Sequence, residues 1–325
     1  MKLSILDQSP IRVGGTARQA LQETLTLAKR AEEWGFHRFW VSEHHNTEAL
    51  AGSAPEVLLA ALGAATSRIR IGSGGVMLPH YSAFKVAETF SLLSNLYPGR
   101  IDLGVGRAPG SDMVTARILA TDGKPKFERF PQLVQDLRRM LNDDGFRPKV
   151  TPRPSEPPPI WMLGSSPDSA MLAGRLGLPY NFALFINSSM SPQILDFYRS
   201  HFQPSEKLAA PHTCLTVGVL CADTEEEAQR LALSRQLLFL RFVTQQGNAQ
   251  VPTVEEAEQY PYSPQELAFL QNKFQRTAIG NPKQVKQQLQ QLADEFRADE
   301  IMTVTITYDF AARLRSYELL ADLFS

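Results

Sequence analysis

The sequence predicts an α/β fold, a (β/α)₈ barrel, from three observations. Short apolar runs alternate with longer segments in which apolar residues recur every three or four positions, the pattern of strands followed by helices. About eight such units follow one another, and their apolar runs suit parallel strands covered by helices. The chain has 325 residues, a length that such barrels reach as one domain. We therefore expect a single barrel over residues 1–325, in preference to an open doubly wound sheet.

The expected strands are short apolar runs that end at small, polar or charged residues. They cover residues 3–6, 39–42, 69–71, 101–105, 160–163, 182–186, 215–220 and 301–306. The segment 151–159, just before the fifth of them, is rich in proline and is predicted to be irregular.

The expected helices carry apolar residues at helical spacing. Gly35 and Gly177 can each end a helix in the left-handed conformation. Ser53 and Glu56 have the spacing of a capping box ahead of the second helix. The helices cover residues 17–34, 57–62, 84–96, 130–141, 169–176, 194–202, 225–243 and 311–324.

One segment, 245–278, interrupts this rhythm near the seventh and eighth strands. It is polar, contains Pro252, Pro261 and Pro264, and has no clear period. An insertion of this length is either a mobile lid or a packed excursion with short helices. The sequence leaves both interpretations open.

Composition bounds the possible partners. The chain is 43% hydrophobic and 21% charged with a net charge of -1, so no basic stripe favours nucleic acid or an anionic membrane. No run approaches the ~20 apolar residues that span a bilayer. The first residues reach Asp7 too early for a signal peptide. Cys214 and Cys221 are expected to be reduced core residues, so we expect a cytoplasmic protein.

The second expected strand ends in Glu43, His44 and His45, where barrels of this class place their function. Neighbouring side chains on a strand point to opposite faces, so the two histidines are not expected to share one ligand. No other clustered donors complete a zinc site, and no metal is expected. One histidine can act as acid or base near neutral pH. A histidine hydrogen-bonded at a strand end is an equally good interpretation.

Other strand ends carry small or cationic residues. Ser73, Gly74 and Gly75 would let a planar ligand approach the backbone closely, or would form a β-bulge or turn. Arg107 is a candidate anion ligand, with a surface ion pair as the alternative. The glycines before Arg107 lack the dinucleotide-binding spacing, and no helix begins there.

A serine-rich turn follows the fifth expected strand. Gly164, Ser165 and Ser166 precede a helix that contains Ser169, and amides at a helix start flanked by hydroxyls suit a phosphate. Capping by Ser166 or Asp168 is the alternative. With Arg107 in the same barrel mouth, a phosphate-bearing cofactor fits both features.

Together these residues resemble the bacterial luciferase-like flavin monooxygenase superfamily, within it the luciferase-like class of oxidoreductases. The resemblance runs in order over most of the chain. It implies a luciferase-like barrel that binds reduced FMN, with His44 as the catalytic histidine. Arg107, Ser165, Ser166 and Ser169 match residues at the flavin phosphate, and Gly74–Gly75 matches a non-prolyl cis peptide beside the flavin ring. The matching stretches are 3–10, 40–45, 71–79, 95–107, 163–177 and 279–282.

The resemblance implies a monooxygenase that uses reduced FMN and O₂ to oxidise a small organic substrate. Reduced flavin would come from a separate flavin reductase or be made with NAD(P)H, Glu43 or Asp7 would tune His44, and a homodimer is expected. The alternatives are a deazaflavin-dependent reductase on the same barrel, a non-catalytic flavin-binding protein and a metal-dependent hydrolase. Gly106 and Ser165 replace a cysteine and an acidic residue of the luciferase α subunit, so light emission is not implied.

Overall fold

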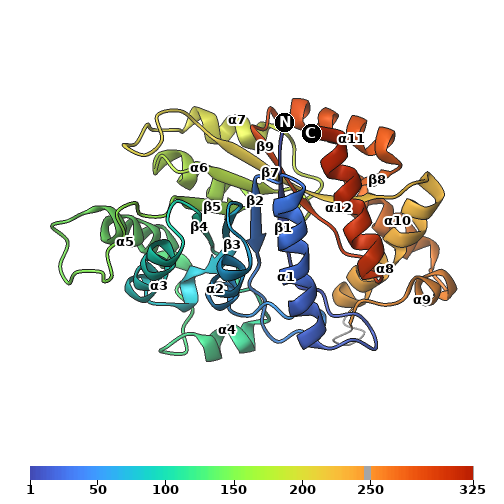
Figure 1. The fold of residues 1–325 in the computed structure, drawn as a ribbon, viewed down its shortest axis with the longest axis horizontal. Helices are drawn as coiled ribbons and strands as arrows, with labels where there is room; N and C mark the ends of the chain where they lie inside the picture. The colour runs from blue at the N-terminus through green and yellow to red at the C-terminus, as the bar shows by residue number, and fades with distance from the viewer. Residues whose placement is uncertain (245–249, 325) are drawn as a thin grey trace.

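A computed structural model describes residues 1–244 and 250–324, and these residues form a closed barrel of eight parallel strands surrounded by helices (Figure 1). The strands follow the order β6-β5-β4-β3-β2-β1-β9-β7, and pairing of β6 with β7 closes the ring. This confirms the predicted (β/α)₈ barrel. The ring strands are β1 (Lys2–Asp7), β2 (Arg38–Val41), β3 (Arg70–Met77), β4 (Ile101–Gly106), β5 (Ile160–Gly164), β6 (Tyr180–Ala183), β7 (Thr213–Cys221) and β9 (Glu300–Val304).

Helices cover the outside of the barrel, and one further strand lies at one end of it. β8 (Ala278–Gly280) lies outside the ring and pairs only with the last residues of β7. The helices are α1 (Ala17–Glu33), α2 (Pro55–Ala65), α3 (Ala83–Leu96), α4 (Met113–Leu119), α5 (Phe130–Asn142), α6 (Pro167–Arg175), α7 (Gln193–Ser200), α8 (Glu225–Val243), α9 (Val254–Gln259), α10 (Pro264–Phe274), α11 (Pro282–Phe296) and α12 (Phe310–Phe324).

Several boundaries test the local predictions. Gly35 and Gly177 have φ of 81° and 60° and follow α1 and α6, as predicted. The capping box at Ser53 is wrong, because Pro55 begins α2 and leaves Ala54 as the N-cap with no side-chain bond. The sixth strand begins two residues earlier than predicted and ends at Ala183, since the apolar residues after it form a turn. The proline-rich segment 151–159 has no regular structure, as predicted.

The insertion 245–278 contains short helices, the second of its two predicted alternatives. Residues 245–249 lie outside the described residues. Of the rest, α9 and α10 pack against α8, where the ring of Phe239 stacks on that of Phe269 at 5.9 Å. Lys273 of α10 donates to the carbonyl oxygens of Phe185 and Ile186, which follow β6. The insertion is thereby joined to the end of the barrel at which the strands terminate.

Buried apolar residues form three clusters, of which the smallest two are separate from the main one, and one of these joins the end of β7 to α8 and α9. The larger cluster lies between the outer face of the barrel and the helices. A smaller cluster fills the barrel interior with Leu6, Trp40, Trp161, Cys214, Met302 and Val304. Cys214 and Cys221 are buried and unpaired, as predicted. No helix in residues 1–244 and 250–324 has the length and apolar character needed to cross a bilayer.

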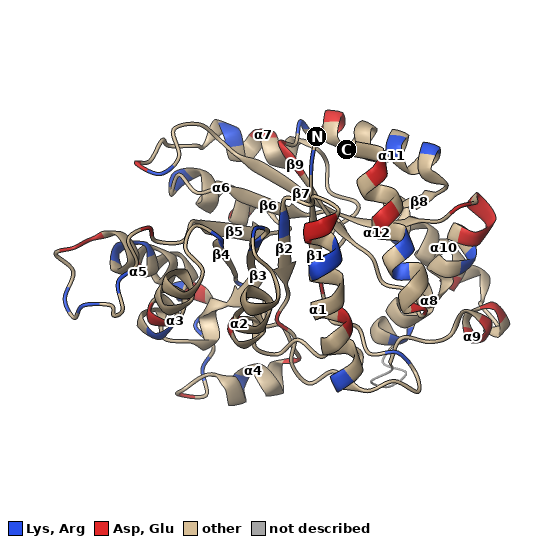
Figure 2. Cartoon of the chain, in the orientation of Figure 1, with Lys and Arg blue, Asp and Glu red and all other residues tan. Residues whose placement is uncertain are grey.

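Positions of both charge signs are interspersed along the outer helices in this view (Figure 2). A separate charged group lies inside the barrel at the strand starts. Arg38 of β2 donates to Asp102 of β4 at 2.7 Å and to Glu300 of β9 at 3.1 Å. Burial alone would raise the pKa of Glu300, but hydrogen bonding to His212 and the charge of Arg38 lower it to about 2. The floor of the barrel is therefore held by ionised, paired groups.

We predict that Arg38→Met lowers the free energy of unfolding by about 3–5 kcal/mol, because it leaves Asp102 and Glu300 buried with less compensating charge. Urea unfolding followed by circular dichroism measures the change. The matched control is Arg30→Gln, which removes an exposed ion pair with Glu33 and should change stability by less than about 0.5 kcal/mol. Equal effects of the two substitutions would contradict the role given to the floor.

Candidate active site

The side-chain alternation of β2 places His44 in the barrel mouth. Arg38 and Trp40 point into the barrel, whereas Phe39 and Val41 pack outward against the helices. The alternation continues beyond the last strand residue, so Ser42 and His44 follow Trp40 on the inner side. The hydroxyl of Ser42 lies 3.1 Å from Nδ1 of His44. His44 is therefore held at one ring nitrogen, and among the described residues its other ring nitrogen, Nε2, has no hydrogen-bond partner.

Glu43 and His45 lie on the opposite side, as the alternation predicted. Nε2 of His45 is 2.9 Å from Oε1 of Glu43. Glu43 also accepts hydrogen bonds from the Met77 amide at 3.0 Å and the Tyr81 hydroxyl at 2.7 Å. Burial, with a smaller effect of Glu43, raises the pKa of Glu56 nearby. This buried network joins the end of β2 to the end of β3 behind the mouth.

The environment of His44 keeps its imidazole neutral. Burial lowers its pKa from 6.5 to about 4, and the charge of Glu43 opposes this shift only in part. Asp7, the second carboxylate expected to tune His44, instead pairs with Arg313 of α12 and accepts from the Ser9 amide. Of the two predicted carboxylates, Glu43 is the one that acts on His44.

A bulge within β3 lies just beyond the last residues of that strand that pair with β2. The Gly74–Gly75 peptide is cis, as the resemblance predicted, and the pairing of β3 with β4 shifts register between Ser73 and Val76. A Cβ on Gly75 would lie 2.8 Å from the backbone carbonyl oxygen of Gly104, so glycine is required there. The hydroxyl of Ser73 is fully buried and donates to the Gly104 carbonyl at 2.9 Å. The Ser73 hydroxyl is therefore occupied within the protein, and the close approach of a ligand to this backbone stays a prediction.

Arg107 and the start of α6 lie together at the ends of β4 and β5. Nη2 of Arg107 is 4.0 Å from Oδ2 of Asp168, and both side chains are more than half exposed. Ser166 is the N-cap of α6 and accepts from the Ser169 amide at 3.5 Å, so the capping alternative is correct for this serine. The surface ion pair predicted as the alternative for Arg107 is therefore present. Arg107 also lies beside the capped start of α6, where a bound anion would compete with Asp168.

The turn before α6 is fixed by contacts of Ser169 and Gly164. The hydroxyl of Ser169 is 3.0 Å from that of Tyr180 and donates to the Ser166 carbonyl at 2.7 Å. A Cβ on Gly164 would lie 2.0 Å from that hydroxyl, so glycine is required for the contact. Asn187 donates to the Ser165 carbonyl at 3.0 Å. These bonds fix the turn, and a direct bond from Ser169 to phosphate stays a prediction.

The loop after β4 contacts two histidines, His45 after β2 and His80 after β3. The His45 amide donates to the Gly110 carbonyl at 2.9 Å, and Nε2 of His80 is 2.8 Å from the Pro109 carbonyl. The sequence did not indicate these contacts or the role of Ser42, although Ser42 stands two residues before His44 and shares its face by strand alternation. No sequence pattern indicated that Tyr81 would donate to Glu43. Among the described residues, no three His, Cys, Asp or Glu side chains are grouped to hold a metal ion.

Comparison with known proteins agrees with this geometry. The family model for luciferase-like monooxygenases matches residues 1–299. The chain belongs to the luciferase-like monooxygenase family. It is 39% identical to a luciferase-like monooxygenase of Escherichia coli (strain K12), over 98% of this chain and 96% of that protein.

Two further matches within the luciferase-like monooxygenase family are similarly complete. The N-acetyl-S-alkylcysteine monooxygenase of Bacillus subtilis (strain 168) is 39% identical, covering 99% of this chain and 98% of the relative. The crystal structure of apo-MsnO8 superposes with a TM-score of 0.94 at 40% identity, covering 99% of this chain and 98% of that one. The family supports an oxidoreductase of the monooxygenase type.

We predict that the His44 imidazole stays neutral well below its usual titration range. NMR titration of the ring signals, assigned by their loss in His44→Gln, should give a midpoint near 4. The sign follows from a depressed pKa: the unfolded chain binds the proton first, so His44 destabilises the fold as pH falls from about 6.5 towards 4. A midpoint at or above 6.5 would contradict the burial described here.

Proposed function

We propose that this protein is a flavin-dependent monooxygenase that uses reduced FMN and O₂ to oxidise a small organic substrate. The observation that carries the proposal is the neutral, partly exposed His44 beside the Gly74–Gly75 bulge. β2 and β3 are paired neighbours up to Val41 and Ser73, so the histidine and the bulge occupy adjoining strand ends. Arg107 and the start of α6 supply a cationic end to the same mouth.

The residues present fit FMN. The phosphate would bind Arg107 and the amides and hydroxyls of Ser165 and Ser166, because a cation and a helix start meet there. The ring system would lie along Gly74–Gly75, which carry no side chains of their own. Ser73, Gly164 and Ser169 would support these contacts from the layer beneath. When bound and reduced, the flavin supplies two electrons, so that one oxygen atom enters the substrate and the other leaves as water.

His44 would hold and move a proton at Nε2. The ring is neutral near pH 7, and within the described residues Nε2 has no hydrogen-bond partner, whereas Nδ1 lies against Ser42. A neutral imidazole can donate or accept according to its tautomer, and the Ser42 hydroxyl can complement either form. His44 therefore suits proton transfer to or from the reacting oxygen or the substrate. Glu43, on the opposite face, positions the segment that carries it.

The comparisons support a small substrate without identifying it. One relative is named for N-acetyl-S-alkylcysteine, which contains a thioether sulfur that can accept an oxygen atom. We include thioethers among the candidate substrates, beside aldehydes and aromatic compounds. Reduced FMN would be delivered by a separate flavin reductase or produced with NAD(P)H, and the working form would be a homodimer.

We predict that His44→Ala lowers oxygenation about 100-fold or more, the usual range for losing a general acid or base. The assay supplies NADH, a flavin reductase, FMN and ¹⁸O₂ to the protein with N-acetyl-S-methylcysteine, hexanal or phenol. Mass spectrometry should find one ¹⁸O atom in a product of the wild type. The control is His201→Ala, whose histidine bonds the Phe197 carbonyl at the end of α7 and should leave the rate unchanged.

Two results would contradict the proposal. A His44→Ala protein as active as the wild type would remove the role of this histidine. A wild type that leaves all three compounds unlabelled, fails to bind FMN and instead transfers hydride with a reduced deazaflavin under nitrogen would favour the reductase alternative.

A further inference from the structure

Arg235 is a cation that the proposed flavin site does not use. It belongs to α8, and its guanidinium lies against β7: a Cβ on Gly218 would be 2.4 Å from Nη1 and 3.2 Å from Cζ. Cys214 and Thr216 point into the barrel, so alternation directs position 218 inward as well. The absence of a side chain at Gly218 leaves the space that the guanidinium occupies at the end of β7.

Arg235 has no anionic partner. Within residues 1–244 and 250–324, no carboxylate lies in ion-pair distance of its guanidinium and no acceptor receives a hydrogen bond from it. The other deeply placed arginines differ, since Arg38 pairs with Asp102 and Glu300, and Arg313 pairs with Asp7. A desolvated cation without a counter-charge is costly, and a bound anion would remove that cost.

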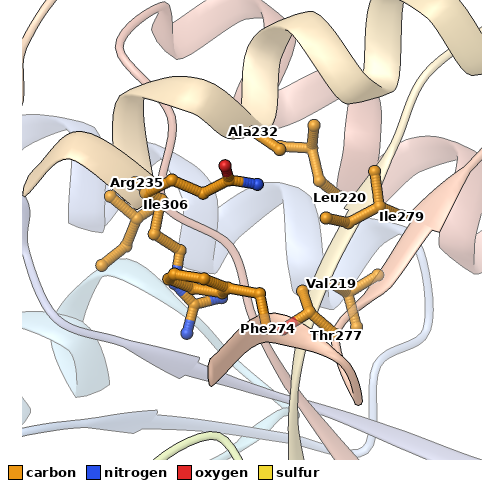
Figure 3. Close-up of a pocket in the computed structure, with 9 residues that line it drawn as sticks. Val219, Leu220, Ala232, Arg235, Phe274, Thr277, Ile279 and Ile306 are labelled. Atoms are coloured by element: carbon orange, nitrogen blue, oxygen red, sulfur yellow. The ribbon is translucent and has the colours of Figure 1, made fainter. Parts of the chain in front are cut away.

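Apolar groups border the head group of Arg235, a half-buried residue. Phe274 lies with its ring centroid 5.4 Å from Cζ, and Thr277 and Ile306 complete the wall (Figure 3). Burial lowers the pKa of Arg235 to about 10, so the group stays charged near neutral pH. Beside it lies a cavity of about 10 Å³, room for about one water-sized group. The space suits the end of a ligand rather than a whole ligand.

A second cation reinforces this site. Burial, with the charge of Arg235 as the next cause, lowers the pKa of Lys273. Nζ of Lys273 lies 4.9 Å from the centroid of the Phe239 ring, and it donates to two carbonyl oxygens without meeting a carboxylate. Two like charges with aromatic walls therefore share one side of the mouth.

The position of this pair separates it from the expected flavin contacts. His44, Gly74–Gly75, Arg107 and the α6 start follow β2, β3, β4 and β5, which are consecutive in the ring. β7 lies across the ring, between β6 and β9. Arg235 therefore faces the part of the mouth that these contacts leave open for substrate.

We propose that the substrate carries a carboxylate on an apolar body. Arg235 binds this carboxylate, and Lys273 adds a second positive charge nearby. A planar guanidinium matches a carboxylate in two-point geometry, and the phenylalanine rings would contact the apolar body. The inference deepens the proposed function and rests on it, since it assigns the substrate class of the same mouth.

The test compares 4-phenylbutanoate with its neutral analogue 4-phenylbutanamide by calorimetric titration of the FMN-loaded full chain. The wild type should bind the acid at least about tenfold more tightly than the amide, the usual effect of one charge-assisted hydrogen bond. Arg235→Gln should abolish this preference, and Lys273→Gln should reduce it. The matched control Arg175→Gln, which removes an exposed arginine in the last turn of α6, should keep it.

Two readouts keep the outcome clear. Urea unfolding should show that Arg235→Gln is at least as stable as the wild type without ligand, because the substitution removes an uncompensated charge. FMN affinity, measured separately, should be the same in all four proteins, and its absence from the wild type would overturn the proposed function alone. Equal affinity of the wild type for acid and amide, or a preference retained by Arg235→Gln, would overturn the carboxylate assignment.

Discussion

The paired charges on Arg38 fix which side chains of β2 face the barrel interior, and the site depends on that choice. The guanidinium in the barrel floor must keep Asp102 and Glu300 as partners. A shift of β2 by one residue would break these ion pairs and would turn its inward-facing side chains towards the helices. Trp40, Ser42 and His44 then follow on the inner side. Glu43 and His45 fall outside, where their network ties β2 to β3. One ion-pair cluster at the strand starts thus orients a histidine at the strand ends.

The mouth has two cationic regions with different surroundings. Arg107 is exposed and lies beside a helix start, which favours a solvated, doubly charged phosphate. Arg235 is enclosed by Phe274 and neighbouring apolar groups, which favours a small anion attached to an apolar body. Between them stand the glycine bulge of β3 and the neutral His44. In the function we propose, the first region would bind the cofactor and the second the substrate.

The sequence predicted those features that arise from local periodicity. Eight strand–helix repeats predicted the ring, alternation predicted that His44 and His45 diverge, and the matched motifs predicted the cis Gly74–Gly75 peptide. Features that depend on distant contacts were missed. α9 and α10 carry no long apolar period. α10 is held to α8 by aromatic contacts of Phe239, and α9 by ion pairs with Arg230 and Arg241 of α8. Arg235 resembles any arginine of a solvated helix until the fold sets it against Gly218. The supposed cap at Ser53 failed because Pro55 set the helix start.

The central claim is that this barrel binds reduced FMN through its phosphate and ring together. The most direct measurement is an anaerobic fluorescence titration of the protein with reduced FMN, reduced riboflavin and a reduced deazaflavin cofactor. We expect reduced FMN to bind at least about tenfold more tightly than riboflavin, because Arg107 and the α6 start would bind the phosphate. We also expect it to bind more tightly than the deazaflavin. Equal affinity for FMN and riboflavin, or tighter binding of the deazaflavin, would contradict the central claim.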